Sequence, residues 1–415
     1  MNIVVIGGGA AGMMAAGRAG ELGAKVLLVE KNKQPGRKLL LTGKGRCNVT
    51  NSSNLDTFIR SYHGKGRFLY SAFNHFFHDD LRELLKQNGV NLKAERGGRL
   101  FPVSDKAADV VLALIKYCQQ NKVKIQTEAE VIGIIAEEGK VKGIKTAQGF
   151  VACEAVVVAT GGKSYAATGS TGDGYKWATA LGHTVIPPRP ALVPLNIQEA
   201  WVKELQGVAL KNVEVKLLQG DKVLGKEFGE MLFTHFGVSG PVILTLSYLV
   251  AEKAAQQGLH LEINLKPALD EEKLDQRLKR DFQKYQRKQL QNAFADLLPQ
   301  RLIPVVISLS GIAPTKFVHQ ITKEERRKLV QTLRSLSMTV LGPRSLAEAI
   351  ITAGGISLRE VNSGTMESKV IQGLYFAGEV LDVDGYTGGF NLQTAFSTGY
   401  LAGESAVLKL RTNAH

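Results

Sequence analysis

A glycine-rich turn near the N-terminus constrains the fold more than any other feature of the sequence. Residues 2–6 (NIVVI) have the pattern of a buried strand, and Gly7-x-Gly9-x-x-Gly12 leads from this strand into a predicted helix over about 10–22. The first glycine permits the tight turn, and the second lets the backbone approach a pyrophosphate. The third lets the helix pack closely on the strand, while the helix N-terminus offers N–H groups to phosphates. The pattern predicts a Rossmann-type dinucleotide-binding domain.

Further segments indicate which dinucleotide fits this domain. A second predicted strand, 25–29, ends at Glu30, whose carboxylate can accept hydrogen bonds from the adenosine ribose. Residues 153–162 (CEAVVVATGG) and 373–379 (GLYFAGE) resemble strand-and-turn elements of two-domain flavoproteins. Residues 388–393 (GGFNLQ) lead into a predicted helix whose N-terminus can face the flavin. No second Gly-x-Gly-x-x-Gly follows a strand, so the separate NAD domain of disulfide reductases is missing, and we expect FAD.

The length and the prolines predict a domain that is interrupted by an insert. A chain of 415 residues is too long for one ordinary domain. The prolines at 187–190 (PPRP) mark a boundary, and glycine-rich α/β character returns from about 353. We expect an α/β fold in which a discontinuous Rossmann-type FAD-binding domain, 1–190 and 353–415, is interrupted by an insert, 191–352. The insert is expected to contain a β-barrel, at about 191–268 and 305–345, and a helical part at about 269–304.

The charge of the chain favours an anionic partner. Lys and Arg number 52 against 38 Asp and Glu, which gives a formal net charge of +14. Such a surplus attracts polyanions. Basic residues gather in segment 31–67 and on a predicted helix within 270–300, where an ordinary solvated face explains them equally well. Taken together, the two stretches could follow the phosphates of a nucleic acid. The basic residues of the helix are Lys273, Arg277, Lys279, Arg280, Lys284, Arg287 and Lys288.

Cysteine usage and hydropathy indicate the compartment. The three cysteines, Cys47, Cys118 and Cys153, are odd in number and widely spaced, so they predict neither a disulfide framework nor a metal cluster. The apolar N-terminal run lacks a basic region, and no apolar stretch approaches the ~20 residues of a membrane helix. We therefore expect a cytoplasmic protein with no membrane span and no metal site.

Several long strings resemble one group of bacterial flavoproteins over nearly the whole chain. Its members are described as aminoacetone oxidases, bile-acid-pathway flavoproteins and flavin-type ribosomal RNA dihydrouridine synthases. The resemblance implies an FAD domain interrupted by a β-barrel and a helical insert. The strings are 38–51 (KLLLTGKGRCNVTN), 159–174 (ATGGKSYAATGSTGDG), 234–241 (THFGVSGP), 354–356 (GGI), 365–369 (TMESK) and 378–393 (GEVLDVDGYTGGFNLQ).

The expected FAD site draws on segments from both ends of the chain. Motif positions and the resemblance together supply twenty candidate contacts. They are Gly7, Gly9, Ala10, Ala11, Gly12, Glu30, Lys31, Lys38, Arg46, Asn48, Val131, Ala159, Thr160, Gly161, Gly378, Glu379, Gly389, Asn391, Leu392 and Gln393.

Candidate catalytic groups lie in loops that should approach the flavin. Cys47 is the first candidate for a proton donor, because a thiol beside Arg46 can have a lowered pKa. A small buried cysteine packing against the ring is an equally good interpretation. His235 is the second candidate, reaching from the insert, although it could instead cap a turn. Tyr165 and Tyr386 lie in glycine-rich loops, where a structural role is at least as good an explanation.

The leading interpretation is reduction of a uridine of 23S ribosomal RNA to dihydrouridine. NADPH or NADH would supply the electrons, hydride would reach C6, and Cys47 or His235 would protonate C5. The uracil must be unstacked or already accessible for this chemistry. The alternative is a small-molecule flavin oxidoreductase, either an amine oxidase or an enoate-type reductase, because one fold serves many chemistries. A third possibility is a non-catalytic flavoprotein.

Overall fold

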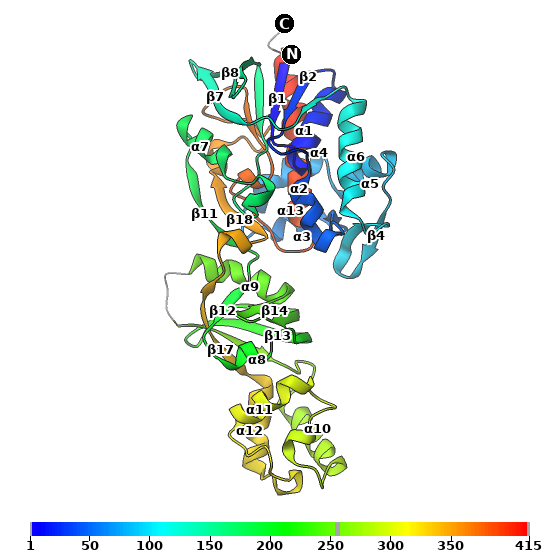
Figure 1. Ribbon diagram of the computed structural model, residues 1–415, viewed down its shortest axis with the longest axis vertical. Helices are drawn as coiled ribbons and strands as arrows, with labels where there is room; N and C mark the ends of the chain where they lie inside the picture. The colour runs from blue at the N-terminus through cyan, green and yellow to red at the C-terminus, as the bar shows by residue number, and fades with distance from the viewer. Residues whose placement is uncertain (1, 254–257, 413–415) are drawn as a thin grey trace. The chain divides into compact units, whose positions relative to one another are not determined.

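The chain folds into two compact units in the computed structural model, which describes residues 2–253 and 258–412 (Figure 1). The first unit combines Met1–Arg189 with Ile350–His415, and the second comprises Pro190–Ala349. The predicted class is confirmed, since a Rossmann-type sheet is interrupted by a closed barrel and helices.

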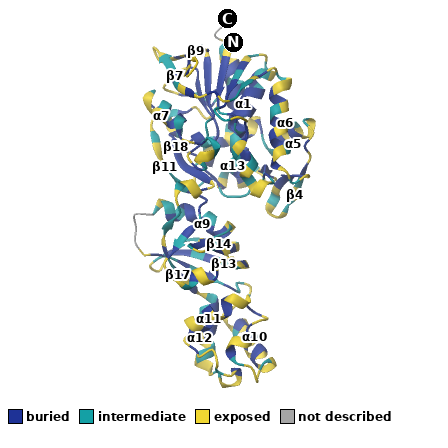
Figure 2. Cartoon of the chain, in the orientation of Figure 1, coloured by how far each residue is buried: buried dark blue, intermediate teal, exposed yellow. Residues whose placement is uncertain are grey.

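A five-stranded parallel sheet forms the centre of the first unit, in the order β19-β10-β1-β2-β6. Its inner strands read as continuous apolar runs because helices and loops cover both faces, and all four residues of β10 are buried. Figure 2 shows strands at the centre of the first unit in the dark blue of buried residues. Since β10 pairs with β1 on one side and β19 on the other, the sheet joins distant parts of the chain. The strands are β1 (Asn2–Ile6), β2 (Lys25–Val29), β6 (Lys124–Gln126), β10 (Ala155–Val158) and β19 (Leu374–Phe376).

Two helices, α1 (Ala10–Glu21) and α13 (Phe390–Thr412), pack closely against each other beside this sheet. The contact depends on small residues four apart on each helix. A Cβ atom at Gly399 would lie 2.3 Å from the carbonyl oxygen of Ala11, and one at Gly403 would lie 2.2 Å from that of Ala15. The helix from the C-terminal part is thereby fitted directly onto the helix that follows the glycine turn.

Smaller sheets and helices complete the first unit. Two three-stranded antiparallel sheets have the orders β7-β8-β9 and β3-β5-β4, and β11 pairs with β18. The strands are β3 (Thr50–Asn51), β4 (Leu92–Glu95), β5 (Arg99–Pro102), β7 (Val131–Glu137), β8 (Lys140–Thr146), β9 (Gly149–Ala152), β11 (Val185–Ala191) and β18 (Ile351–Ile356). The helices are α2 (Arg37–Leu41), α3 (Leu55–Arg60), α4 (Tyr70–His75), α5 (His78–Gln87), α6 (Ala107–Gln120) and α7 (Asp173–Ala180).

A closed barrel in the order β12-β15-β14-β13-β16-β17 forms the first part of the second unit. Burial alternates along its strands, as expected where one face meets a core. A tight turn joins β13 to β14 at Gly220, where φ is +55°, between the paired residues Gln219 and Lys222. Its elements are β12 (Leu195–Ile197), α8 (Trp201–Glu204), β13 (Ala209–Gln219), β14 (Lys222–Phe233), β15 (Gly237–Ser239), α9 (Pro241–Glu252), β16 (Leu259–Asn264) and β17 (Leu336–Pro343).

The helical part of the second unit extends beyond the expected range of about 269–304. Helices α10 (Glu271–Lys284), α11 (Ile303–Ser310) and α12 (Lys323–Arg334) reach to residue 334. The expectation of barrel structure over 305–345 was therefore wrong except for β17. The capping box that starts α12 is formed, because Thr322 accepts a hydrogen bond from the N–H of Glu325 and returns one to its carboxylate.

Two features are absent from the residues that the structure describes. In residues 2–253 and 258–412, no helix combines the length and the apolar character needed to cross a bilayer. Within the same ranges, His, Cys, Asp and Glu side chains form no group of three or more that is arranged to hold a metal ion.

Candidate functional site

The glycine turn lies at the carboxyl edge of the parallel sheet and leaves room for a ligand. A Cβ atom at Gly7, where φ is +102°, would lie 2.5 Å from the carbonyl oxygen of Ala159, and one at Gly12 would lie 1.8 Å from that of Gly7. At Gly9, in contrast, an added Cβ would meet no protein atom within 4 Å. Helix α1 starts after Gly9 without a side-chain cap, so its first N–H groups are available to phosphate. This open cradle fits the pyrophosphate of FAD.

The carboxylate of Glu30 links the glycine turn to the residues that follow β2. Its carboxylate accepts hydrogen bonds from the N–H of Gly8 at 2.8 Å, the N–H of Asn32 at 2.8 Å and the Asn32 side chain at 2.6 Å. A carboxylate has about four acceptor sites. One ribose hydroxyl can therefore be added without breaking these contacts.

The charge of Lys31 is satisfied within the protein. Its Nζ atom lies 2.8 Å from Asp173 and 2.5 Å from the hydroxyl of Thr171. The neighbouring Asn32 donates a hydrogen bond to the carbonyl oxygen of Thr168 at 3.0 Å. Lys31 and Asn32 thus hold the loop that follows β10 in place.

Lys38 and Glu379 were both predicted as cofactor contacts, and the structure brings them together. The Nζ atom of Lys38 lies 2.6 Å from the Glu379 carboxylate, which also accepts hydrogen bonds from the Ser164 hydroxyl at 2.9 Å and the Thr352 N–H at 2.8 Å. At the preceding Gly378, where φ is +76°, a Cβ atom would lie 2.8 Å from that of Ala11. The acid of the GLYFAGE segment is thereby fixed by three separate segments.

The side chains at the start of α13 are occupied by internal hydrogen bonds. Asn391 accepts a hydrogen bond from the N–H of Gly385 and donates one to its carbonyl oxygen, both at 2.8 Å. Gln393, which is fully buried, accepts one from Thr50 at 2.6 Å and donates one to Ser397 at 2.9 Å. These two side chains hold the loop and the helix, so we expect their backbone rather than their side chains to face the cofactor.

Replacing Gln393 with leucine is expected to destabilise the first unit without abolishing flavin binding. The change leaves the buried hydroxyl of Thr50 without its acceptor, which costs about 1–3 kcal/mol. Urea unfolding should therefore shift to lower concentration while the visible flavin spectrum is retained. Loss of the flavin at unchanged stability would contradict this structural role and indicate a direct contact.

Arg46 and Cys47 are neighbours in sequence but do not interact as predicted. Arg46 is ion-paired with Glu95 and Asp105, and its guanidinium lies 4.2 Å from the centre of the Phe101 ring. Cys47 is 0% exposed, and burial raises the pKa of its thiol to about 11. The expectation that Arg46 lowers the pKa of Cys47 was therefore wrong, and the thiol is protonated at neutral pH.

The remaining predicted contacts lie along the same edge or next to it. Ala159, Thr160 and Gly161 follow β10, and the buried Thr160 hydroxyl has no hydrogen-bond partner among the described residues. Val131 is the first residue of β7 and is buried. The amide of Asn48, oriented by its neighbours, accepts a hydrogen bond from the N–H of Gly389 at 3.0 Å. The other candidates on this edge are Ala10, Ala11 and Leu392, which lie in the first turns of α1 and α13.

His235 belongs to the second unit, between β14 and β15, and its side chain is exposed. The turn is closed by Thr234, whose hydroxyl accepts a hydrogen bond from the N–H of Gly237 at 3.1 Å. The ring of His235 packs edge-on against Phe236, with centroids 4.9 Å apart. His235 therefore does not cap the turn.

Comparison with known proteins assigns the family. A sequence model described as "HI0933-like protein Rossmann domain" matches residues 1–405. The chain belongs to the HI0933-like family. This is a family of FAD-dependent oxidoreductases, which confirms the resemblance noted from the sequence.

Curated relatives of this HI0933-like protein match over nearly the full length. The ribosomal RNA dihydrouridine synthase of Escherichia coli is 33% identical over 411 residues, 98% of each chain. The protein of the same name from Haemophilus influenzae is 32% identical, with 96% of each chain covered. The 3-dehydro-bile acid delta(4,6)-reductase of Clostridium scindens is 33% identical, with 98% of each chain covered.

Solved structures share the fold of the HI0933-like chain. A quinol fumarate reductase FrdA variant of E. coli has a TM-score of 0.52 at 18% identity, covering 100% of this chain and 71% of that chain. A flavocytochrome c3 fumarate reductase has a TM-score of 0.51 at 16% identity, covering 98% and 78%. At such identities the likeness concerns the fold alone.

A cluster of charged side chains near the predicted flavin segments was missed by sequence reasoning. Lys65 lies 2.5 Å from Asp382, and Nε2 of His63 lies 4.0 Å from Oδ2 of Asp384. The ring of His63 packs edge-on against Tyr386, with centroids 4.7 Å apart. The string 378–393 contained both aspartates, but no periodic pattern places the loop of His63 beside them.

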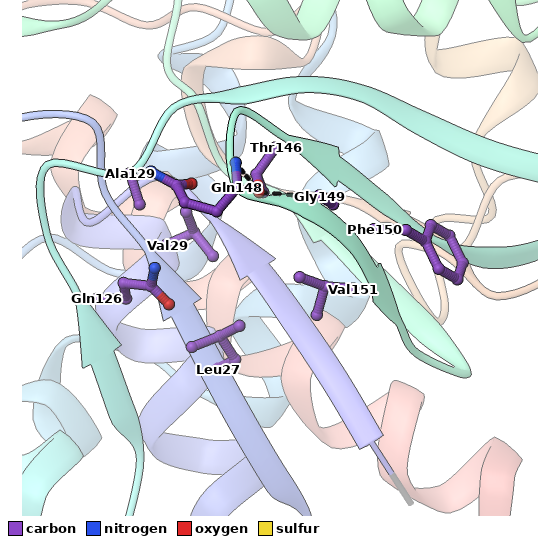
Figure 3. A pocket seen from close by; sticks show the side chains of 9 residues that line it. All are labelled: Leu27, Val29, Gln126, Ala129, Thr146, Gln148, Gly149, Phe150 and Val151. Carbon is purple, nitrogen blue, oxygen red and sulfur yellow. Dashed lines mark hydrogen bonds between the residues drawn. The ribbon is translucent and has the colours of Figure 1, made fainter.

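A small pocket next to the parallel sheet is not the cofactor site. It lies between β2 and the β7-β8-β9 sheet and has a volume of about 80 Å³ (Figure 3). Ligand pockets usually measure about 300–1,000 Å³, so a nucleotide does not fit. The hydroxyl of Thr146, which lines the pocket, donates a hydrogen bond to the carbonyl oxygen of Gly149 and accepts one from the N–H of Gln148. It is lined by Leu27, Val29, Gln126, Ala129, Thr146, Gln148, Gly149, Phe150 and Val151.

Proposed function

We propose that this HI0933-like protein reduces a uridine of 23S ribosomal RNA to dihydrouridine, with NADPH or NADH as the source of electrons. The observation that carries the proposal is the likeness, at 33% and 32% identity over nearly the whole chain, to two proteins named ribosomal RNA dihydrouridine synthase. The net charge of +14 supports an RNA partner. An RNA substrate of this kind would place the protein in the cytoplasm.

The twenty candidate contacts would hold FAD along the edge formed by the glycine turn, Glu30 and Glu379. Bound and reduced, FAD supplies the hydride that adds to C6 of uracil. The protein must present an unstacked base and provide a proton at C5. The thiol of Cys47 is protonated at neutral pH, since its pKa is about 11, and it stays our first sequence-based candidate, with His235 second.

Most of the cations on α10 form ion pairs within the protein. Fewer cations of this helix therefore remain for the proposed binding of RNA phosphates. Four of its cations form ion pairs: Lys273 with Asp270 at 3.0 Å, Arg277 with Asp281 at 2.9 Å, Lys279 with Asp275 at 2.9 Å and Lys284 with Asp296 at 2.7 Å. Arg280 and Arg287 are exposed and have no ion pair among the described residues. In segment 31–67 the cations with no such partner are Lys33, Arg37, Lys44, Arg60 and Arg67.

RNA affinity is expected to fall steeply as salt rises, and unpaired arginines should account for part of the slope. The double variant Arg280→Gln, Arg287→Gln should lower the slope of log affinity against log salt by about 2. The matched double variant Lys273→Gln, Lys279→Gln should change it less, because those cations already have carboxylate partners. Titration of a 23S ribosomal RNA fragment at several salt concentrations measures both slopes. A salt-independent affinity would argue against a phosphate-binding surface.

Mass mapping of 23S ribosomal RNA tests the substrate. Deletion of the gene should convert one dihydrouridine to uridine, and expression of the wild-type chain should restore it. Ribosomal RNA that is unchanged by the deletion would remove the proposal.

A small-molecule reductase is the second candidate function. It is favoured by the 33% identity, over 98% of each chain, to the 3-dehydro-bile acid delta(4,6)-reductase. The reaction in this relative's name and the reduction of uridine have one feature in common. Both reduce a carbon–carbon double bond that is conjugated to a carbonyl group. Turnover of an unsaturated 3-oxosteroid, with ribosomal RNA unaffected by deletion, would support it over RNA modification.

A further inference from the structure

A buried carboxyl group in the first unit lacks the partners that such a group requires. Neither carboxylate oxygen of Asp384 has a hydrogen-bond partner among the described residues, and its side chain is 2% exposed. An ionised carboxylate is costly to bury without partners. Nε2 of His63 lies 4.0 Å from Oδ2 of Asp384. A shift of about 1 Å would bring these atoms within hydrogen-bond distance.

The surroundings of Asp384 favour its neutral form. Burial raises the pKa of Asp384 to about 6. The charges of Asp382 and Glu379 act in the same direction, whereas those of Lys65 and Arg189 oppose it. The carboxyl group can therefore gain and lose a proton close to neutral pH.

The surroundings of His63 also favour its neutral form. Burial, Lys65 and Arg189 lower the pKa of His63 to about 4. In an unfolded chain the carboxyl ionises first and the imidazole keeps the proton. The fold reverses that order, so that between about pH 4 and 6 a carboxylic acid faces a neutral imidazole.

The two side chains differ slightly in exposure, and their loops are in contact. The side chain of His63 is 10% exposed, against 2% for Asp384. Their loops are joined, since the N–H of Tyr386 donates a hydrogen bond to the carbonyl oxygen of Ser61 at 3.0 Å. Asp384 also lies within residues 379–389, whose ends are candidate flavin contacts.

We propose that Asp384 and His63, in place of the sequence-based candidates Cys47 and His235, form a proton-delivery pair for the double bond that is reduced, an inference that rests on the proposed function. The O–H bond of Asp384 breaks as an N–H bond forms at Nε2 of His63. The N–H bond at Nδ1 breaks as a C–H bond forms at the substrate carbon next to the one that receives the hydride. Asp384, left as a carboxylate, regains its proton from solvent through His63. Asp384 acts through His63 and is a positioning residue, whereas His63 contacts the substrate.

Infrared titration of the flavin-loaded protein tests the stored proton without substrate. The wild type should show the carbonyl band of a protonated carboxyl that disappears as pH rises through about 6. The band should be absent from Asp384→Asn. It should persist in the control Asp382→Asn, which removes a carboxylate that is ion-paired with Lys65 in the same cluster. A wild type without the band, or an Asp384→Asn variant that keeps it, overturns the proposal.

Single-turnover reduction of 23S ribosomal RNA from cells that lack the protein tests the transfer. Asp384→Asn and His63→Gln should each slow substrate reduction by about 10²–10³-fold. Reduction of the bound flavin by NAD(P)H should be unchanged, since it requires no substrate proton. Wild-type rates in both variants overturn the pair. His63→Gln alone makes the comparison if Asp384→Asn does not fold. If the wild type leaves this RNA unreduced, the proposed substrate is wrong, and the infrared titration alone decides whether the pair stores a proton.

Discussion

Replacing Gly12 with valine is expected to give a purified protein without flavin. An added Cβ atom would lie 1.8 Å from the carbonyl oxygen of Gly7. This oxygen belongs to the backbone and cannot rotate away as a flexible side chain can. The turn and the first residues of α1 must then move apart. We expect FAD affinity to fall by at least about 100-fold, equivalent to about 2.8 kcal/mol. Flavin absorbance per mole of protein, with circular dichroism to verify folding, measures the effect.

A second glycine of the same motif supplies the matched comparison. At Gly9, where φ is −81°, an added Cβ meets no protein atom within 4 Å. Gly9→Ala should therefore leave the unfolding free energy within about 0.5 kcal/mol of the wild type, while the methyl group occupies space intended for the pyrophosphate. FAD binding at full strength in Gly9→Ala would show that the pyrophosphate does not lie against this residue.

Replacing Gly403 with leucine is expected to destabilise the first unit strongly. Its Cβ would lie 2.2 Å from the carbonyl oxygen of Ala15, so the side chain separates two helices whose backbones are in contact. Overpacking typically costs about 1–3 kcal/mol, and the clash with a backbone atom places this change at the upper end of that range. The midpoint of urea unfolding should fall accordingly.

The control places the same leucine on the exposed side of the same helix. Lys409 is exposed, and its only described ion pair, with Glu367, is long at 3.9 Å. Lys409→Leu should therefore change the midpoint little. Equal midpoints for Gly403→Leu and the wild type would contradict the close packing of α1 and α13.

The parts of the site that depend on local spacing could be predicted from the sequence. The glycine turn needs a strand, three glycines and a helix in immediate succession, so its position follows from residues 2–22. The ion pair between Lys38 and Glu379 could not be predicted in this way. Lys38 and Glu379 were each identified from their own motif, but their ion pair joins residues 341 positions apart. Such a pairing depends on the order of strands in the sheet, which local spacing does not encode.

The incorrect prediction for Cys47 and the missed cluster around His63 share a physical cause. Arg46 precedes Cys47, yet its side chain extends to Glu95 and Asp105, because adjacency along the chain does not determine side-chain direction. The loop of His63 contains no periodic pattern that would place it against Asp384. The expected barrel range of 305–345 was wrong for another reason, because it included helix signals that the sequence itself contains: α12 has both a capping box and apolar residues at helical spacing.

The place of β10 between β1 and β19 in the parallel sheet has a consequence for biosynthesis. Its neighbours are β1 and β19, so one side of this strand stays an unpaired edge until residues 374–376 have left the ribosome. Contacts between such distant segments slow folding, and an open edge invites aggregation. A nascent chain of this protein should therefore be unable to retain flavin until synthesis has passed Glu379, which makes cofactor capture a late step of maturation.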